Sequence, residues 1–429
     1  MNRHQTALIT MMGFLFLSVS NSLFAISSYS NADYLRTLNR SASVGTMDAM
    51  FFNPAGTVRL PDGIYIQGGV DFPVIYRALP TLASPYKRIG LGLPLADLGF
   101  VYKRAGSSVF VTLMPSVGNG LNLPGLTLSG KNPPPAGMIT VMDADYSFKN
   151  ITYELTAGGA FSFNDIVAMS FGARLITDMS LTGVNYTYID AGNPYKEKYS
   201  NNLITFGAAM HAGLLVTPSP WFAMSINLHS GGFAAGKNNV KSVILPTAGA
   251  GKPPSDHENR PQSGGSVVNG LPARMDLGFL FNVNDVMNLQ LTGQARVELF
   301  KNTPTGVSFD LPSVSFGYSA GLGMDFKFSK NFTWGLGLMY SDDTTKDTAY
   351  YSAVDSLNIV KLRSITVGTG FSFNIGEMFG LSLGAAYPLY FTTENGFSLT
   401  NLTMPGGGQA QISDILIALG INIKMDGLF

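Results

Sequence analysis

The sequence of 429 residues contains no cysteine. A disulfide framework, a thiolate-ligated zinc site, an iron–sulfur cluster and a cysteine nucleophile are therefore all excluded. Charged residues make up 13% of the chain, which is about half of their share in soluble globular proteins. Lys+Arg and Asp+Glu number 27 each, so no net charge attracts nucleic acid or acidic lipid. The chain carries too little charge for an ordinary solvated surface.

Long apolar runs, the mark of a helical membrane protein, are missing as well. After residue 25, no uninterrupted apolar run reaches the roughly 18 residues that a spanning helix needs. Residues 1–25 have a short polar head, an apolar stretch from Ala7 to Val19 and a small-residue end at Ala25. This pattern is typical of a secretory signal peptide, with an uncleaved anchor as the alternative. We therefore expect an exported protein.

Apolar residues recur at every second position almost everywhere after residue 60, which is the pattern of β-strands. Between Ile151 and Phe163, for example, one face is apolar and the other carries threonine, glutamate, serine and small residues. The same division recurs over residues 288–299 and 414–426. Because soluble β-sandwiches also alternate, this pattern alone does not separate them from membrane barrels.

Aromatic pairs and the lengths of the connections favour a membrane barrel. On the apolar face, pairs of phenylalanines two residues apart precede short polar turns, at Phe161/Phe163, Phe279/Phe281, Phe326/Phe328 and Phe371/Phe373. Aromatic rings gather in this way at one membrane interface of a barrel, whereas in a sandwich they would lie in the core.

The connections alternate strictly between short and long. Short turns fall near 104–107, 164–165, 217–220, 283–285, 329–331 and 374–377, and Gly/Pro/Asn-rich stretches near 77–94, 118–147, 190–199, 232–270, 301–312, 342–356 and 393–410. Outer-membrane barrels have short periplasmic turns and longer external loops. The sequence therefore predicts an all-β fold, a transmembrane antiparallel β-barrel of about 14 strands over residues 61–429. We expect both long stretches 118–147 and 232–270 to be external loops.

Residues 26–60 do not alternate, include Pro54, and are too few for a domain of their own. A barrel of about 14 strands is too wide for its own side chains to fill. We therefore expect residues 26–60 to form an N-terminal hatch, or plug, in the lumen.

The motif Asn53-Pro54-Ala55-Gly56, preceded by the small residues of 41–49, resembles the FadL/TodX-type outer-membrane transporters of long-chain fatty acids and other hydrophobic molecules. The strand count and the terminal Phe429 extend this resemblance over nearly the whole chain. The resemblance implies a hatch inside the barrel, a hydrophobic binding site beside it, and lateral exit through a kinked third strand. It also implies a monomer in the outer membrane of a Gram-negative bacterium, in contact with lipid and lipopolysaccharide.

A lateral gate is expected at Pro115, Gly118 and Gly120. The third strand is predicted over about Ser108–Val117, and proline cannot donate to the strand ladder while glycine weakens it. A gap in the wall is one interpretation, and a strand that simply ends one residue early is the other.

Transport of an apolar solute needs an apolar pocket rather than covalent chemistry or a cofactor. The predicted substrate-binding residues are Phe51 and Phe52 on the hatch and the inward-facing Ile176, Leu215, Leu280, Phe300, Met339, Leu362 and Leu416. Packing against a loop or the hatch is the alternative for each of them. Arg174, Arg274 and Arg296 also face inward and could meet a substrate carboxylate. Pairing across strands is their alternative, since inward charges of both signs are present.

No enzyme is predicted. Gly317-Tyr318-Ser319-Ala320-Gly321 matches the pattern of a hydrolase nucleophile elbow, but it lies inside an alternating strand. The histidines have no metal-ligand spacing; His211 and His229 face the lumen, as possible neighbours that fill it with polar groups. The resulting hypothesis is passive uptake of hydrophobic molecules, with long-chain fatty acids favoured. A general polar-solute porin and a structural or adhesive barrel are the alternatives.

Overall fold

Antiparallel strands form most of the part of the chain that the structure describes. The computed structural model describes residues 31–79, 86–91, 94–126, 140–190, 193–246, 264, 266–298, 300–303, 306–309, 315–344, 363–391, 402–403 and 409–426. The predicted signal peptide (1–25) and Leu362 lie outside the described residues. Within the described part, no helix has the length and apolar character to cross a membrane.

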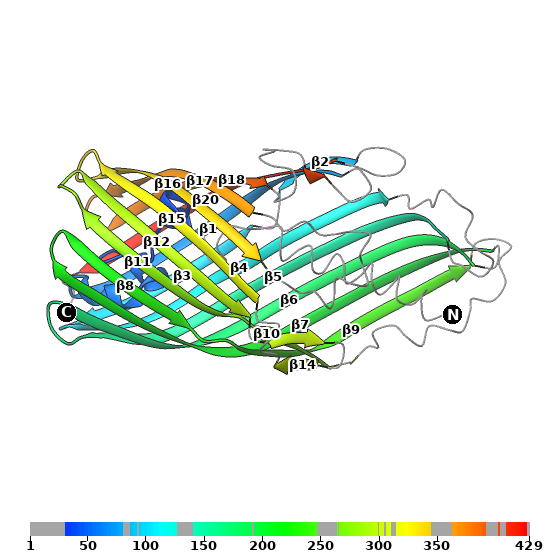
Figure 1. Ribbon diagram of the computed structural model, residues 1–429, viewed down its shortest axis with the longest axis horizontal. Coiled ribbons are helices and arrows are strands. Elements are labelled where there is room, and N and C mark those ends of the chain that lie inside the picture. The colour runs from blue at the N-terminus through cyan, green and yellow to red at the C-terminus, as the bar shows by residue number, and fades with distance from the viewer. Residues whose placement is uncertain are drawn as a thin grey trace.

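The strands follow one another around a closed sheet (Figure 1). They are β1 (Gly63–Leu79), β2 (Tyr86–Leu91), β3 (Leu95–Arg104), β4 (Ser107–Leu126), β5 (Thr140–Ser162), β6 (Val167–Asp190), β7 (Asn193–Ser219), β8 (Phe222–His229), β9 (Gly232–Pro246), β10 (Ser266–Leu271), β11 (Ala273–Asn282), β12 (Met287–Glu298), β15 (Ser315–Lys327), β16 (Phe332–Thr344), β17 (Arg363–Ile375), β18 (Phe379–Phe391) and β20 (Gln409–Asp426). A small hairpin of β13 (Phe300–Thr303) and β14 (Gly306–Phe309) and the short β19 (Leu402–Thr403) complete the set.

Pairing of the first strand with the last closes the ring, since β1 pairs antiparallel with β20 from Gly63↔Asp426 to Ala78↔Gln411. At three places in the ring, two successive strands together occupy the position of one. β2 and β3 both pair with β1, and β8 and β9 both pair with β7. In the next position, β10 pairs with β9 and β11 pairs with β8. The predicted antiparallel barrel of 14 strands is therefore confirmed.

The outer surface of this barrel is apolar. Along β3 every second side chain is buried and those between are exposed, apart from the half-buried Tyr102; the exposed positions include Leu98 and Phe100. Met210 on β7 is 73% exposed and Leu419 on β20 is 53% exposed. A water-soluble protein does not carry such a continuous apolar surface, whereas a barrel in lipid requires one. The sidedness thus excludes a sandwich, which would have put these residues in its core.

Aromatic rings form a belt near the short turns. Phe161 and Phe163 are both exposed, with ring centroids 4.9 Å apart, and Phe371 stacks on Phe332 at 5.6 Å. Phe328 lies 6.5 Å from Trp334 on the neighbouring strand. Aromatic rings are enriched where the hydrocarbon of a membrane meets its headgroups, so this belt suits the membrane interface.

Side chains of asparagine close the short turns. Asn164 Oδ1 accepts hydrogen bonds from the backbone N–H groups of Ile166 at 2.8 Å and Val167 at 2.7 Å. Asn284 makes the same pair of contacts with Val286 and Met287, at 2.9 and 2.8 Å. The short amide side chain thus replaces backbone partners that a tight turn cannot supply.

The predicted external loops 118–147 and 232–270 are wrong in part, because much of both is strand. β4 runs on to Leu126, β5 begins at Thr140, and β9 extends to Pro246. Figure 1 shows β5, β6, β7 and β9 reaching far beyond β15 and β16 at the end opposite the short turns. Their ladders continue in register, for example from Leu121↔Phe148, so pairing with neighbours overrides the loop-like glycine and asparagine content.

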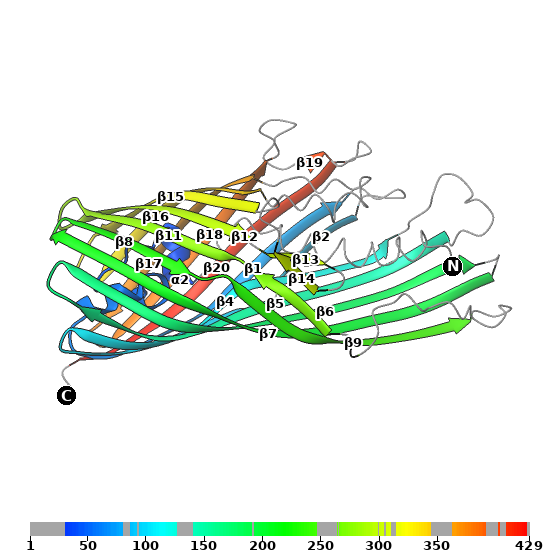
Figure 2. The same ribbon diagram turned by 60° about the horizontal axis from the view of Figure 1, so that its bottom comes forward.

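Residues 31–60, called the N-terminal segment from here on, lie inside the barrel toward the short-turn end (Figure 2). The segment contains α2 (Ala32–Thr37), α3 (Ala49–Phe52) and the 3-10 helix η1 (Pro54–Arg59). The Asn31 side chain caps α2 by accepting from the Tyr34 N–H at 2.8 Å. Nearly every residue of the segment is buried, and its helices contact β1, β3–β7, β15–β18 and β20.

Candidate functional site in the barrel lumen

Glycines on the inner wall let α2 lie directly against the strands. A Cβ added at Gly337 on β16 would collide with the carbonyl oxygen of Thr37, and one at Gly368 on β17 with that of Leu35. Gly384 on β18 meets the carbonyl oxygen of Ala32 in the same way. Side chains at these positions would hold the helix away from the wall, so the glycines shape a seat for its backbone.

We expect Gly337→Val to displace α2 from this seat. The added side chain overpacks a buried contact, for which a cost of about 1–3 kcal/mol in the free energy of unfolding is typical. Denaturant unfolding and ion conductance in planar bilayers measure the two consequences, lower stability and higher leakage. Gly293→Val is the matched control, since no atom lies within 4 Å of a Cβ at Gly293 on β12. Equal stability and equal ion leakage of the two variants would show that Gly337 does not seat α2 against the wall.

Buried ion pairs attach the segment to β15. Arg40 Nη1 lies 3.2 Å from Asp325 Oδ2, and Arg36 donates to the other oxygen of the same carboxylate. Within the segment, Arg40 Nε lies 3.4 Å from Asp48 Oδ2. Burial alone would lower the pKa of the Arg40 guanidinium, but the carboxylates of Asp325, Asp48 and Asp33 raise it above its ordinary value. Arg40 therefore stays cationic, and Asp325 is the shared partner of Arg36 and Arg40.

Apolar contacts hold the remaining faces of the segment in three buried clusters. The first joins Tyr34, Leu35 and Leu38 to Met339, Ala386, Leu416 and Ala418; the second joins Ala42, Ala55 and Val58 to Ala160, Ala168, Leu215, Ala223 and Leu280; the third joins Met50, Phe51 and Leu60 to Tyr65, Val101, Phe110 and Met114. Four inward-facing residues predicted to bind substrate, namely Leu215, Leu280, Met339 and Leu416, thus pack with the N-terminal segment, which was their alternative role.

The other predicted apolar residues have different surroundings. Phe51 is 8% exposed within the third cluster, and Phe52 stacks on Tyr34 with ring centroids 5.4 Å apart. Ile176 on β6 is buried. Phe300 begins β13, where the structure describes the backbone only.

The motif residues of the segment hold its own fold together. Asn53 donates from Nδ2 to the carbonyl oxygen of Ser43 at 2.9 Å, which ties α3 back to the preceding loop. Pro54 occupies the first position of η1, where its missing N–H costs nothing. A Cβ at Gly56 would collide with the carbonyl oxygen of Ser43, and Ala55 is fully buried. Each residue of Asn53-Pro54-Ala55-Gly56 therefore fits the fold of the segment through its packing, its backbone or a hydrogen bond.

Two of the three predicted basic residues, Arg174 and Arg274, lie in a polar cluster on β5, β6, β8 and β11. Arg174 contacts both carboxylate oxygens of Glu154, at 2.5 and 2.6 Å. Arg274 lies 2.9 Å from Asp276 and 3.0 Å from His229 Nε2. Both cations thus have a carboxylate partner in this structure. Arg296 stands opposite Arg274 in the register of β11 and β12.

A histidine pair completes this cluster. His211 and His229 face each other in the register of β7 and β8, with ring centroids 4.9 Å apart. The prediction that they are neighbours is therefore confirmed. His211 Nε2 also lies 3.2 Å from the hydroxyl of Ser170, a partner that the sequence did not indicate. Among the described residues no group of three or more acidic or histidine side chains is placed to hold a metal ion.

The wall is interrupted where the gate was expected. The ladder between β3 and β4 ends at Leu98↔Leu113, and on its other side β4 skips one residue between Pro115 and Val117 in its register with β5. The exposed N–H of Ala96 donates instead to the Tyr153 hydroxyl of β5, at 3.3 Å. The side chain of one strand thus reaches across the next to bridge the interruption.

The two glycines of the predicted gate are placed differently from Pro115. Gly118 and Gly120 stay paired with Ile151 and Lys149 of β5. The loss of pairing therefore lies on the β3 side of β4, while the ladder toward β5 resumes after a single-residue bulge.

Together these features define a closed β-barrel whose lumen is filled at the short-turn end by its own N-terminal segment. No protein-family model and no curated protein matches the sequence. Solved structures do match its fold. It is similar to a Pseudomonas aeruginosa FadL homologue at 15% identity, covering 92% of this chain and 98% of that one with a TM-score of 0.58.

The toluene transporter TodX of P. putida is similar at 13% identity over 94% of this chain and 99% of its own, with a TM-score of 0.61. The Ralstonia pickettii toluene transporter TbuX shares 13% identity over 90% and 95% of the two chains, with a TM-score of 0.57. The predicted resemblance to the FadL/TodX type is therefore confirmed for the fold.

Proposed function

We propose that the protein is a bacterial outer-membrane channel for passive uptake of hydrophobic molecules, with long-chain fatty acids as the first substrate class. The occupied lumen carries this proposal: the N-terminal segment is buried inside the barrel, against β1, β3–β7, β15–β18 and β20. Such a lumen suits the gated passage of an apolar solute, whereas a general porin has an open aqueous path. The similar solved structures, which include two toluene transporters, support hydrophobic substrates.

In this proposal the N-terminal segment acts as the hatch. A solute that enters from the long-strand end meets the segment, and Phe51 and Phe52 stand at its apolar clusters. Displacement of the segment exposes Leu215, Leu280 and Met339, which then contact the solute. Arg174, Arg274 and Arg296 remain candidates for a substrate carboxylate once their present neighbours shift.

Uptake of radiolabelled oleate tests the proposal in a bacterial host without a long-chain fatty acid transporter of its own. We expect the protein to support uptake and, purified in planar bilayers, to conduct ions poorly. A protein that conducts ions freely and takes up neither oleate nor toluene is a polar-solute porin instead.

Lateral exit beside β4 is the second part of the proposal, supported by the bulge after Pro115 and the ladder that ends at Leu113. We expect Pro115→Val to restore a donor to the strand and to lower oleate uptake about threefold or more without unfolding the barrel. Pro388→Val is the matched control, because Pro388 on β18 is paired with Thr366 in an unbroken ladder. Full uptake by Pro115→Val would remove this exit.

A further inference from the structure

The barrel wall has a second interruption, far from β4, where β8 passes into β9. His211 of β7 pairs with His229, and Ala208 of β7 pairs with Phe233. Two residues of β7 therefore stand against three of the neighbouring strand, which is a β-bulge. Ser230 sits in this bulge, and its hydroxyl accepts the Met210 N–H at 2.8 Å.

On the other side of the same strand, proline interrupts the ladder. β9 pairs with β10 as far as Gly232↔Leu271, and β8 pairs with β11 from His229↔Arg274. Pro272 lies between β10 and β11 and has no N–H to donate. A bulge and a proline thus weaken the wall at one height on both sides of Ser230.

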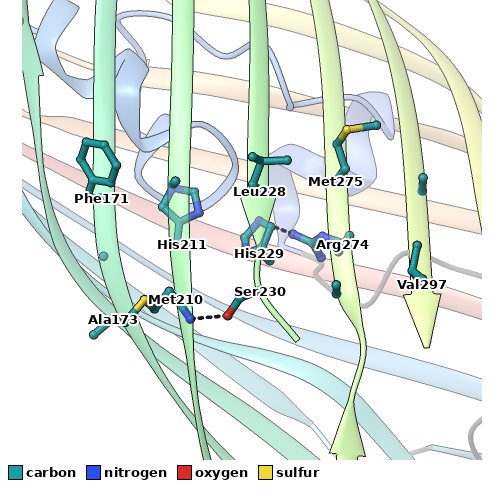
Figure 3. Close-up of a pocket in the computed structure, with 14 residues that line it drawn as sticks. Phe171, Ala173, Met210, His211, Leu228, His229, Ser230, Arg274, Met275 and Val297 are labelled. Atoms are coloured by element: carbon teal, nitrogen blue, oxygen red, sulfur yellow. Dashed lines mark hydrogen bonds between the residues drawn. The ribbon is translucent and has the colours of Figure 1, made fainter. Parts of the chain in front are cut away.

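A cavity of about 890 Å³ lies at this interruption (Figure 3). Large apolar side chains of the outer face surround it: Phe171, Leu228, Met275 and Met210, of which Met210 is 73% exposed. Small residues of the outer face, Ala173, Ala212, Ala273 and Ala295, leave the space between them. Its volume is within the range of small-molecule sites in proteins.

The inner side of this cavity is the histidine pair. Figure 3 shows His211 and His229 side by side on β7 and β8, with Arg274 next to His229. The two histidines also line a second, much smaller cavity on the lumen side, together with Met50 and Phe51 of the N-terminal segment. They are the two residues that line both cavities.

Charges in the cluster indicate which molecules this space accepts. Arg174 is matched by Glu154 and Arg274 by Asp276. An added anion would compete with these carboxylates for the same cations, at the desolvation cost of a charge. The apolar surroundings and compensated charges therefore suit an uncharged, largely apolar molecule, such as an alkylbenzene.

We propose that this wall cavity is a second lateral port, through which uncharged apolar molecules pass from the lumen beside the N-terminal segment into the bilayer, with His211 and His229 as its gate. The port rests on the proposed uptake function, and it differs from the β4 exit in strand, lining and preferred solute.

Photolabelling from the bilayer tests the port directly. The full chain, reconstituted in phospholipid vesicles, is exposed to 3-trifluoromethyl-3-phenyldiazirine, an apolar carbene source that dissolves in the membrane, and adducts are mapped by mass spectrometry. We expect adducts at His211 and His229, which are 3% and 8% exposed. Ala173→Phe and Ala273→Phe fill the cavity from the outside and should each reduce this labelling about fivefold.

Ala320→Phe is the matched control, since Ala320 is also exposed on the outer face but lies on β15, outside the cavity. Two outcomes overturn the port: adducts confined to the outer residues, or histidine labelling that persists when the cavity is filled and so arrives through the lumen. Toluene uptake is measured for the same variants. Absence of uptake by the unmodified protein refutes the transport function, whereas the labelling pattern decides the port separately.

Discussion

Deletion of residues 26–56 is expected to convert the closed barrel into an ion-conducting pore. The described part of this stretch supplies α2, which contacts β1, β15–β18 and β20, and α3, which contacts β3 and β4, near the short turns. A barrel of this strand number leaves an aqueous path when nothing occupies it, so we expect conductance to rise about tenfold or more. Single-channel recording in planar bilayers measures the change.

The deletion needs evidence that the barrel itself still forms. Heat-modifiable migration on gels reports the closed sheet, and the intact chain in the same bilayers gives the reference conductance. A folded, segment-free barrel that leaks no more than the intact protein would show that the N-terminal segment does not occlude the lumen.

Substitution of Asp325 by asparagine is expected to release the segment without removing it. The carboxylate is shared by Arg36 and Arg40, and all three side chains are buried. Removing one partner of a buried ion pair typically costs about 3–5 kcal/mol, and Asp325→Asn leaves these two buried guanidinium groups with one carboxylate fewer. Because the two arginines belong to the segment and Asp325 to β15, most of this cost should be relieved by displacement of the segment.

Open probability in bilayers and the denaturant midpoint should therefore both change in Asp325→Asn, toward more frequent opening and lower stability. Asp165→Asn, in an exposed short turn, is the matched control with the same change of charge. An Asp325→Asn protein that matches this control in both measurements would mean that the ion pairs do not hold the segment.

These two variants also separate the hatch from the lateral exits. The deletion and Asp325→Asn act on the lumen, so they should raise ion leakage. Pro115→Val and Ala273→Phe act on the wall, so they should change the passage of apolar solutes with little effect on ions. If all four variants changed ion leakage and solute passage in the same way, the lumen and the wall would not have distinct roles.

The sequence by itself determined the strands, their sidedness and their number. In the stretch from Ile151 to Phe163 one face is mostly apolar and the other carries the polar residues, and the structure shows Leu155 and Phe161 exposed with Glu154 and Thr156 buried. Lipid imposes this pattern on each strand locally, because every second side chain faces hydrocarbon whatever its neighbours are. The sequence could predict for the same reason that His211 and His229 face the lumen.

Tertiary structure alone decided what lies opposite each inward side chain. Arg36 and Asp325 are 289 positions apart, and no periodicity connects them. Parity likewise placed Leu215 and Leu280 in the lumen, but only the path of the N-terminal segment puts them against Ala42 and Val58. The heights of the strands and the bulge at Ser230 depend on register between neighbours. Register and contact across the lumen arise from three-dimensional packing, which a pattern along the chain does not contain.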